Sequence, residues 1–211
     1  MKEHGLSSVS SYNKYANRGT FMKSQISAKT LASAAMFAAL TFLATSVLKI
    51  PTPTLGYIHI GDAFVLLSGV LFGPLTGGLA AGLGSALADL LGGYVIWAPF
   101  TFVVKFLTAF TAALIFRLVT SRTDGRHSDI LPMVLSGIAG ETVMVLGYLL
   151  TNIILVTATS GSFTSASLAA AVISSIAEIP FNLVQGLTGI IIGTTIQPIF
   201  RHLAPTTAAT A

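Results

Sequence analysis

Six apolar stretches make up most of this 211-residue chain, and they restrict its fold more than any motif does. A helix needs about 20 apolar residues to span a bilayer, and four of the stretches reach that length. The stretches are Ala28–Leu48, Ile60–Phe72, Leu75–Leu91, Trp97–Leu118, Ile130–Thr157 and Leu168–Phe200. The second and third are short and are separated by Gly73-Pro74, a strong helix break, so we interpret them as two tilted helices rather than one re-entrant hairpin. The chain is therefore predicted to be an all-α integral membrane protein with six transmembrane helices.

The composition narrows the function. Charged residues make up 9% of the chain and hydrophobic residues 53%, whereas an average soluble domain is about 25% charged. This excludes a disordered chain, a nucleic-acid-binding protein and an ordinary cytosolic enzyme. The chain has no cysteine, its four histidines are scattered, and no phosphate-binding loop occurs. We therefore expect no metal site, no cofactor and no ATPase activity in this chain.

The positions of lysine and arginine predict the orientation. With both termini in the cytoplasm, nine of the eleven basic residues lie on the cytoplasmic side, as the positive-inside rule requires. These nine are Lys2, Lys14, Arg18, Lys23, Lys29, Arg117, Arg122, Arg126 and Arg201. We expect residues 1–27 to form a flexible cytoplasmic tail, 28–203 the membrane domain, and 204–211 a disordered end.

Several ionisable residues fall inside the predicted spans, where a charge costs roughly 2.5–3.5 kcal/mol. They are Asp89, Lys105, Glu141 and Glu178, with Asp62 close to the start of the second span. Such residues should face the protein interior or a water-filled cavity. Lys105 has two equal interpretations: an ion pair with Glu141 or Glu178, or a contact to an anionic or phenolic ligand group. Asp62 is either a helix cap or a site residue.

The sixth span carries the most informative pattern. Glu178, Asn182 and Gln185 are spaced i, i+4, i+7 and so share one helix face. A carboxylate and two amides suit a polar organic ligand. Asn and Gln also hold membrane helices together, and a proton relay is a third interpretation.

Two loops that face outward in this topology add aromatic candidates. The first contains Tyr57 and His59 before Asp62, and the second contains Tyr94 and Trp97. Tyr and Trp are common at membrane interfaces. Their position beside Asp89 also makes them candidates to stack on a flat ring.

A stripe of small residues occupies one face of the first span: Ala28, Ala32, Ala35 and Ala39. Small stripes permit close helix contact, either within the chain or with another membrane protein.

Several short segments, in this order, give the chain a family resemblance. They are Ala35–Leu40, Gly56–Asp62, Leu71–Gly78, Gly84–Leu90, Gly93-Tyr94, Trp97–Pro99, Lys105 and Pro180–Gln185. Together with the six-span layout, the chain resembles the substrate-binding S components of energy-coupling factor (ECF) vitamin transporters, and most of all their riboflavin-type subgroup. The long N-terminal tail departs from that pattern.

The resemblance implies a mechanism without catalysis. An S component binds a vitamin or precursor from outside and docks on a transmembrane T component that two cytoplasmic ABC ATPases carry. Docking in the family uses an A-x-x-x-A pattern, which Ala35 and Ala39 match. Pyridoxine and hydroxymethylpyrimidine are the expected ligands, with riboflavin as a further candidate. The alternatives are a standalone proton- or ion-coupled transporter and a non-transporting scaffold.

Overall fold

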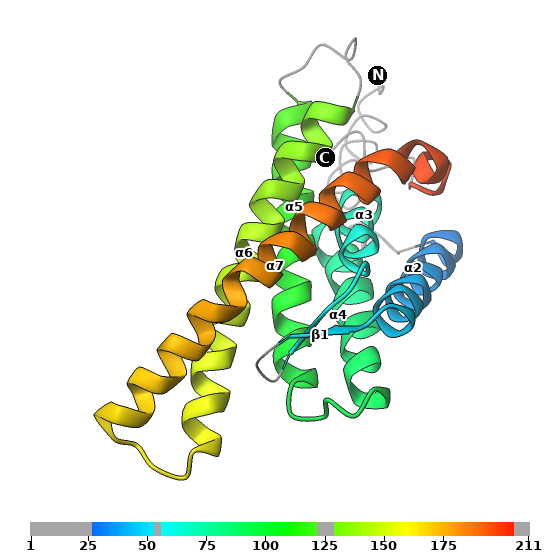
Figure 1. Ribbon diagram of the computed structural model, residues 1–211. Coiled ribbons are helices and arrows are strands. Elements are labelled where there is room, and N and C mark those ends of the chain that lie inside the picture. Colours follow the sequence, from blue (N-terminus) through cyan, green and yellow to red (C-terminus); the bar gives the residue numbers. More distant parts are fainter. Residues whose placement is uncertain (1–26, 53–55, 122–128, 205–211) are drawn as a thin grey trace, which may run out of the picture.

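The computed structural model describes residues 27–52, 56–121 and 129–204 as a helical bundle (Figure 1). Its elements are α2 (Ala28–Val47), β1 (Ile50–Pro51), β2 (Tyr57–Ile58), α3 (Asp62–Phe72), α4 (Pro74–Leu91), α5 (Ala98–Thr120), α6 (Ile130–Thr159), α7 (Ser165–Phe200) and a 3-10 turn, η1 (Arg201–Leu203). The predicted helices are confirmed, with ends that differ from those expected by no more than three residues. The two predicted tails lie outside the described residues, apart from Ser27 and Ala204.

Local sequence explains where the helices begin and end. The Ser27 hydroxyl accepts a hydrogen bond from the Thr30 N–H at the start of α2, and Thr164 and Ser167 form a reciprocal capping box at the start of α7. Gly73 separates α3 from α4 with φ of +82°, a conformation that favours glycine, and Pro74 follows at the first turn of α4. The expected break between two helices is therefore confirmed.

Helix α3 lies at the centre of the bundle, where it packs against α2, α4, α5 and α7. Nine of its eleven residues are buried. The neighbouring helices approach closely because glycine lies at the contacts: a Cβ at Gly69 would overlap the Ala109 carbonyl oxygen. The apolar core beside it includes Phe37 of α2. Its ring centroid lies 5.2 Å from that of Phe72 and 5.1 Å from that of Phe200.

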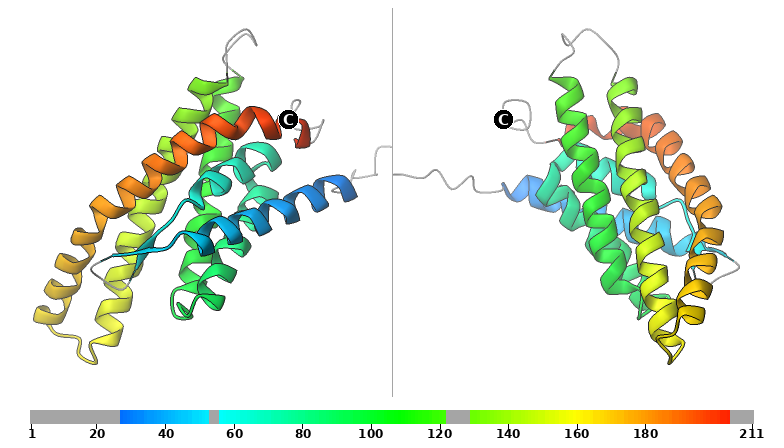
Figure 2. Two further views of the ribbon diagram at one scale, coloured as in Figure 1. Left: turned by 45° about the vertical axis from the view of Figure 1, so that its right-hand side comes forward. Right: turned by 90° about the vertical axis from the view of Figure 1, so that its left-hand side faces the viewer.

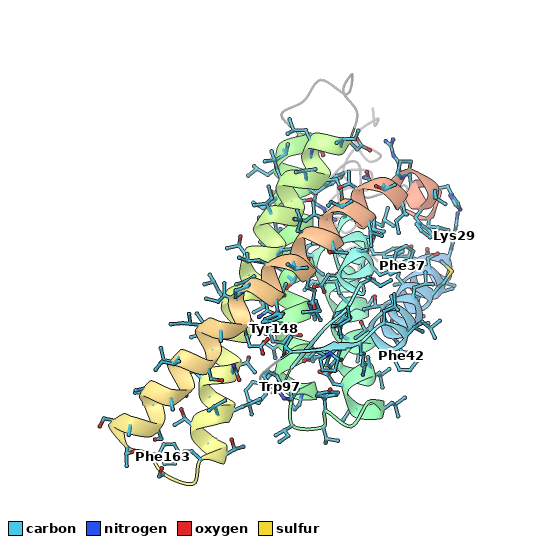
Figure 3. All side chains as sticks on the ribbon, in the orientation of Figure 1. Lys29, Phe37, Phe42, Trp97, Tyr148 and Phe163 are labelled. Atoms are coloured by element: carbon cyan, nitrogen blue, oxygen red, sulfur yellow. The ribbon has the colours of Figure 1, made fainter. Side chains whose placement is uncertain are left out.

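The long helices have the length and composition of membrane spans. Five of them are long and apolar enough to cross a bilayer. Their outward faces carry many exposed Leu and Ile side chains, as expected for contact with lipid tails (Figure 3). Helix α3 rises only about 16 Å, which is less than the roughly 30 Å hydrocarbon core. The count of six spans and the orientation of the termini stay predictions.

Two features of the arrangement position the cavity described below. Helices α6 and α7 run side by side and extend past the other helices where they connect, with Phe163 near the tip (Figures 1 and 3). The strands β1 and β2 form a small antiparallel hairpin, with Ile50 opposite Ile58 and Pro51 opposite Tyr57. Figure 2 shows α2 slanting across α3 and α4 on the side of the bundle away from α6.

Candidate ligand-binding site

A cavity opens between the hairpin segment and the helices α4, α5, α6 and α7. It encloses about 530 Å³ of space, part of it open to solvent. The hairpin segment supplies three residues of its wall, α4 and the α4–α5 connection three more, and α5, α6 and α7 the remainder. The lining residues are Gly56, Tyr57, His59, Asp89, Tyr94, Trp97, Thr101, Tyr148, Asn152, Glu178, Asn182 and Gln185.

The fold brings together most of the residues that the sequence singled out. Eight of the eleven expected binding residues line this cavity: Tyr57, His59, Asp89, Tyr94, Trp97, Glu178, Asn182 and Gln185. The spacing on the sixth span explains one wall, because its three polar residues share a face and all are buried. Contact of these residues with a ligand stays a prediction.

Aromatic rings form two groups in the wall. The Tyr57 ring centroid lies 4.7 Å from that of Tyr94 and 5.5 Å from that of His59. Trp97 and Tyr148 form a second pair, with centroids 6.4 Å apart (labelled in Figure 3). Such faces can stack on a planar ligand ring.

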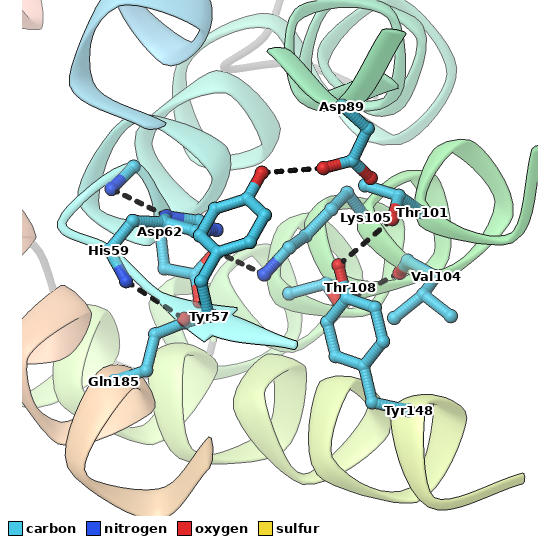
Figure 4. A network of polar contacts seen from close by, with 11 residues as sticks. Tyr57, His59, Asp62, Asp89, Thr101, Val104, Lys105, Thr108, Tyr148 and Gln185 are labelled. Atoms are coloured by element: carbon cyan, nitrogen blue, oxygen red, sulfur yellow. Dashed lines mark hydrogen bonds and ion pairs between the residues drawn. The ribbon is translucent and has the colours of Figure 1, made fainter. Parts of the chain in front are cut away.

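Tyr57 joins the hairpin to the end of α4. Its hydroxyl donates a hydrogen bond of 2.5 Å to the Asp89 carboxylate (Figure 4). Burial and the nearby Asp89 charge raise the pKa of Tyr57 far above its usual range, so the phenol keeps its proton. Lys49 covers the same ring, with Nζ 4.5 Å from the centroid, and donates to the Ala88 carbonyl at 3.1 Å. The hairpin is therefore held to the C-terminal end of α4.

His59 is held as a neutral imidazole. Burial lowers its pKa to about 3. Its Nδ1 accepts a hydrogen bond from the Gly61 N–H at 3.0 Å, which places the single ring proton on Nε2. Its backbone N–H donates to Gln185 Oε1 at 3.1 Å, so the hairpin is also tied to α7.

A buried ion pair lies beside the cavity and corrects the expectation for Lys105. Lys105 Nζ contacts Asp62 Oδ1 at 2.5 Å, and both side chains are fully buried; it does not pair with Glu141 or Glu178. Because Asp62 is the first residue of α3, the central position of that helix brings its carboxylate to α5. Asp62 is therefore not a helix cap: its other oxygen accepts from Gln185 Nε2 at 2.7 Å (Figure 4). Neither residue lines the cavity, and a ligand contact for them stays a prediction.

Glu141 also lies outside the cavity lining. It is 5% exposed, and neither of its carboxyl oxygens has a hydrogen-bond partner in the described part of the chain. Helix α7 packs directly on it, since a Cβ at Gly186 would stand 3.0 Å from Glu141 Cβ. A ligand contact for Glu141 stays a prediction.

Four lining residues were not among the expected binding residues: Gly56, Thr101, Tyr148 and Asn152. One signal could have found two of them. Glu141, Tyr148 and Asn152 are spaced i, i+7, i+11, which places them on one face of α6. Tyr148 also connects the wall to the ion pair, because Lys105 Nζ lies 5.1 Å from its ring centroid.

The chemistry of the wall is that of a binding site. It combines aromatic faces, amides and two acidic side chains, Asp89 and Glu178, with no Lys or Arg among the described lining residues. The described residues also contain no group of three or more His, Asp or Glu side chains placed to hold a metal ion. An all-helical, multi-pass membrane protein with such a cavity at one end of its bundle belongs to the class of membrane-embedded small-molecule binding proteins.

Comparison with known proteins identifies the family. Residues 25–201 match the family of the ECF-type riboflavin transporter S component, and the chain belongs to this family. It is a family of transporter components, not of enzymes. S components bind substrate for an ECF transporter and work with a T component and ATPases.

Two individual proteins are also similar. An uncharacterised protein of Pyrococcus woesei is 38% identical over 150 residues, which are 71% of this chain and 86% of that protein. The solved structure of the S component of a bacterial ECF transporter shares the fold, with a TM-score of 0.55 and 21% identity. That match covers 82% of this chain and 96% of the other.

Proposed function

We propose that this chain binds a small aromatic vitamin or vitamin precursor in the cavity, from the outer face of the membrane, for ATP-driven uptake by partner subunits. The proposed ligands are pyridoxine and hydroxymethylpyrimidine-like compounds, because these small rings carry several hydrogen-bonding groups. Riboflavin is a further candidate, which the name of the family supports. The observation that carries the proposal is the meeting of five elements, distant in sequence, around one aromatic and polar cavity.

The proposal includes a topology of six spans with both termini in the cytoplasm. It rests on the distribution of basic residues and on the six helices of the described bundle. In this orientation the hairpin, Trp97 and the α6–α7 tip lie toward the outside. The cavity then opens toward the compartment from which a vitamin arrives.

Docking is assigned to the small-residue stripe on α2. Helix α2 buries Ser33, Phe37 and Thr41 against the bundle. The stripe residues Ala28, Ala32, Ala35 and Ala39 are all exposed. Small exposed residues let a partner helix approach closely, so a T component and two ABC ATPases are the proposed partners. ATP is used by those ATPases, and no cofactor is assigned to this chain.

Mass spectrometry of small molecules released from the purified, mildly solubilised full chain tests the proposal. We expect a stoichiometric vitamin-like compound. Added ligand should then quench the fluorescence of Trp97, which is the single tryptophan and lines the cavity. A protein that neither retains nor saturably binds any of the three candidate ligands contradicts the proposed function.

A standalone proton-coupled transporter is the second candidate, and buried Glu141 is the observation that favours it. This candidate predicts ligand uptake into liposomes that contain only this chain, abolished by an uncoupler. Uptake that requires the T component and the ATPases, and that is insensitive to the uncoupler, rules it out.

A further inference from the structure

Asn152 is the only described lining residue whose fully buried side-chain nitrogen and oxygen both lack a hydrogen-bond partner. It is 2% exposed, and neither its amide nitrogen nor its amide oxygen has a partner in the described part of the chain. A buried polar group without a partner costs about 1–3 kcal/mol. Thr101 and Tyr57 of the same wall already make side-chain hydrogen bonds.

The position of Asn152 allows this amide to form hydrogen bonds with a ligand in the cavity. Tyr148 and Asn152 are four residues apart on one face of α6, and both line the cavity. An amide presents an acceptor and a donor side by side. Its complement on a ligand is an N–H donor next to an acceptor, as on an aminopyrimidine or on the lactam edge of a flavin. The hydroxyl groups of pyridoxine rotate and offer no such fixed edge.

The charged residues of the wall restrict the charge of the ligand. Asp89 and Glu178 line the cavity, and His59 is neutral. Lys105 is paired with Asp62. Lys49 is not a lining residue: its ammonium lies over the Tyr57 and Tyr94 rings and donates to the Ala88 carbonyl. An anionic ligand would therefore meet two acidic side chains and no Lys or Arg among the described lining residues, whereas an uncharged or cationic ring avoids this repulsion.

We propose that Asn152 determines ligand specificity by pairing with an adjacent donor and acceptor on an uncharged or cationic heteroaromatic ring. This inference rests on the proposed function, because it takes the cavity to be the ligand site. It places aminopyrimidines and flavins ahead of pyridoxine, and all three ahead of their phosphate esters.

Variants of the purified full chain test the proposal by Trp97 fluorescence titration. Asn152→Leu keeps the size of the side chain and removes the amide. We expect it to weaken binding of 4-amino-5-hydroxymethyl-2-methylpyrimidine, or of riboflavin, by about 10- to 100-fold, since each hydrogen bond contributes roughly 1 kcal/mol or more. Pyridoxine binding should change less than about threefold. Thr157→Val is the matched control, because its hydroxyl is also buried without a described partner on α6 but does not line the cavity.

A stability measurement separates ligand recognition from helix packing. Asn152→Leu removes an unpartnered buried amide, so the melting temperature of the ligand-free protein should stay unchanged or rise. A fall of several degrees means that Asn152 holds the helices together, and this overturns the proposal. The phosphate ester of the aminopyrimidine should bind at least about 10-fold more weakly than the free alcohol; tighter binding of the ester also overturns it.

The outcomes distinguish this inference from the function on which it rests. If wild type binds one of these ligands tightly and Asn152→Leu binds it equally well, the cavity is a vitamin site but Asn152 does not determine its specificity. If wild type binds pyridoxine but neither the aminopyrimidine nor riboflavin, the specificity inference fails alone. If wild type binds none of the three, both proposals fail.

Discussion

Breaking the Lys105–Asp62 ion pair is expected to destabilise the protein strongly. Replacement of Lys105 by Met keeps an unbranched side chain and removes the charge. The Asp62 carboxylate is fully buried and would keep a single hydrogen bond, from Gln185. Leaving one member of a buried ion pair uncompensated costs about 3–5 kcal/mol. At roughly 2–4 °C per kcal/mol for a chain of this size, the melting temperature should fall by about 6–20 °C.

A double variant tests whether the uncompensated charge is the cause. Asp62→Asn removes the charge and keeps an oxygen that can accept from Gln185. Lys105→Met combined with Asp62→Asn should therefore regain more than half of the stability that Lys105→Met loses. Thermal unfolding followed by circular dichroism, in one detergent for all variants, gives the comparison.

The ion pair between Arg201 and Asp129 provides the control. Its N–O distance is 2.8 Å, but the two side chains are 61% and 22% exposed. Arg201→Met should cost less than about 1 kcal/mol. The reasoning is refuted if Lys105→Met melts within about 2 °C of wild type, or if the double variant is as unstable as the single one.

Three further predictions concern docking, pH and the hairpin. Ala35→Trp should leave ligand binding unchanged and abolish uptake in proteoliposomes that contain the partner subunits; normal uptake contradicts docking through α2. The pKa of His59 is lowered to about 3 in the fold, whereas it is about 6.5 in an unfolded chain. As the pH falls below about 6.5, the His59 imidazole therefore takes up a proton in the unfolded chain but not in the folded protein. This proton uptake should lower the free energy of unfolding by about 1.4 kcal/mol at pH 5.5. His59→Gln should remove this pH dependence in unfolding titrations. Tyr57→Phe removes the hydrogen bond to the buried Asp89 carboxylate and should weaken ligand binding about 5- to 100-fold in a Trp97 fluorescence titration; unchanged affinity shows that ligand binding does not depend on this bond.

Much of the fold was predictable because the signals that determine it are local. Each helix coincides with an apolar stretch, and Gly73-Pro74 marks the break between α3 and α4 within two residues. The central position of α3 was not predictable, since its burial depends on contacts with five other helices. The same limit explains the error on Lys105, whose partner lies 43 residues away on that helix. From the sequence, Glu141 and Glu178 were the expected partners, and only the packing brings Asp62 to Lys105.

The candidate site was partly predictable for a related reason. Polar and aromatic residues are conspicuous in apolar surroundings, so Glu178, Asn182 and Trp97 could be selected by type and spacing alone. Asn152 escaped selection because α6 offers several polar residues, and the sequence does not show which of them face the cavity. Its missing hydrogen-bond partners are visible only in the folded chain.

Gln185 and Asn152 show why residue type alone does not define a ligand contact. Gln185 accepts from the His59 N–H and donates to the Asp62 carboxylate, so one donor and one acceptor site of its amide are already used. Its main effect is to hold the hairpin and α7 in register with the buried ion pair. Asn152 makes no such bonds, although its amide is the same chemical group. The wall therefore combines an amide that fixes the shape of the cavity with one that is left for the ligand, and substitutions at the two positions should separate stability from affinity.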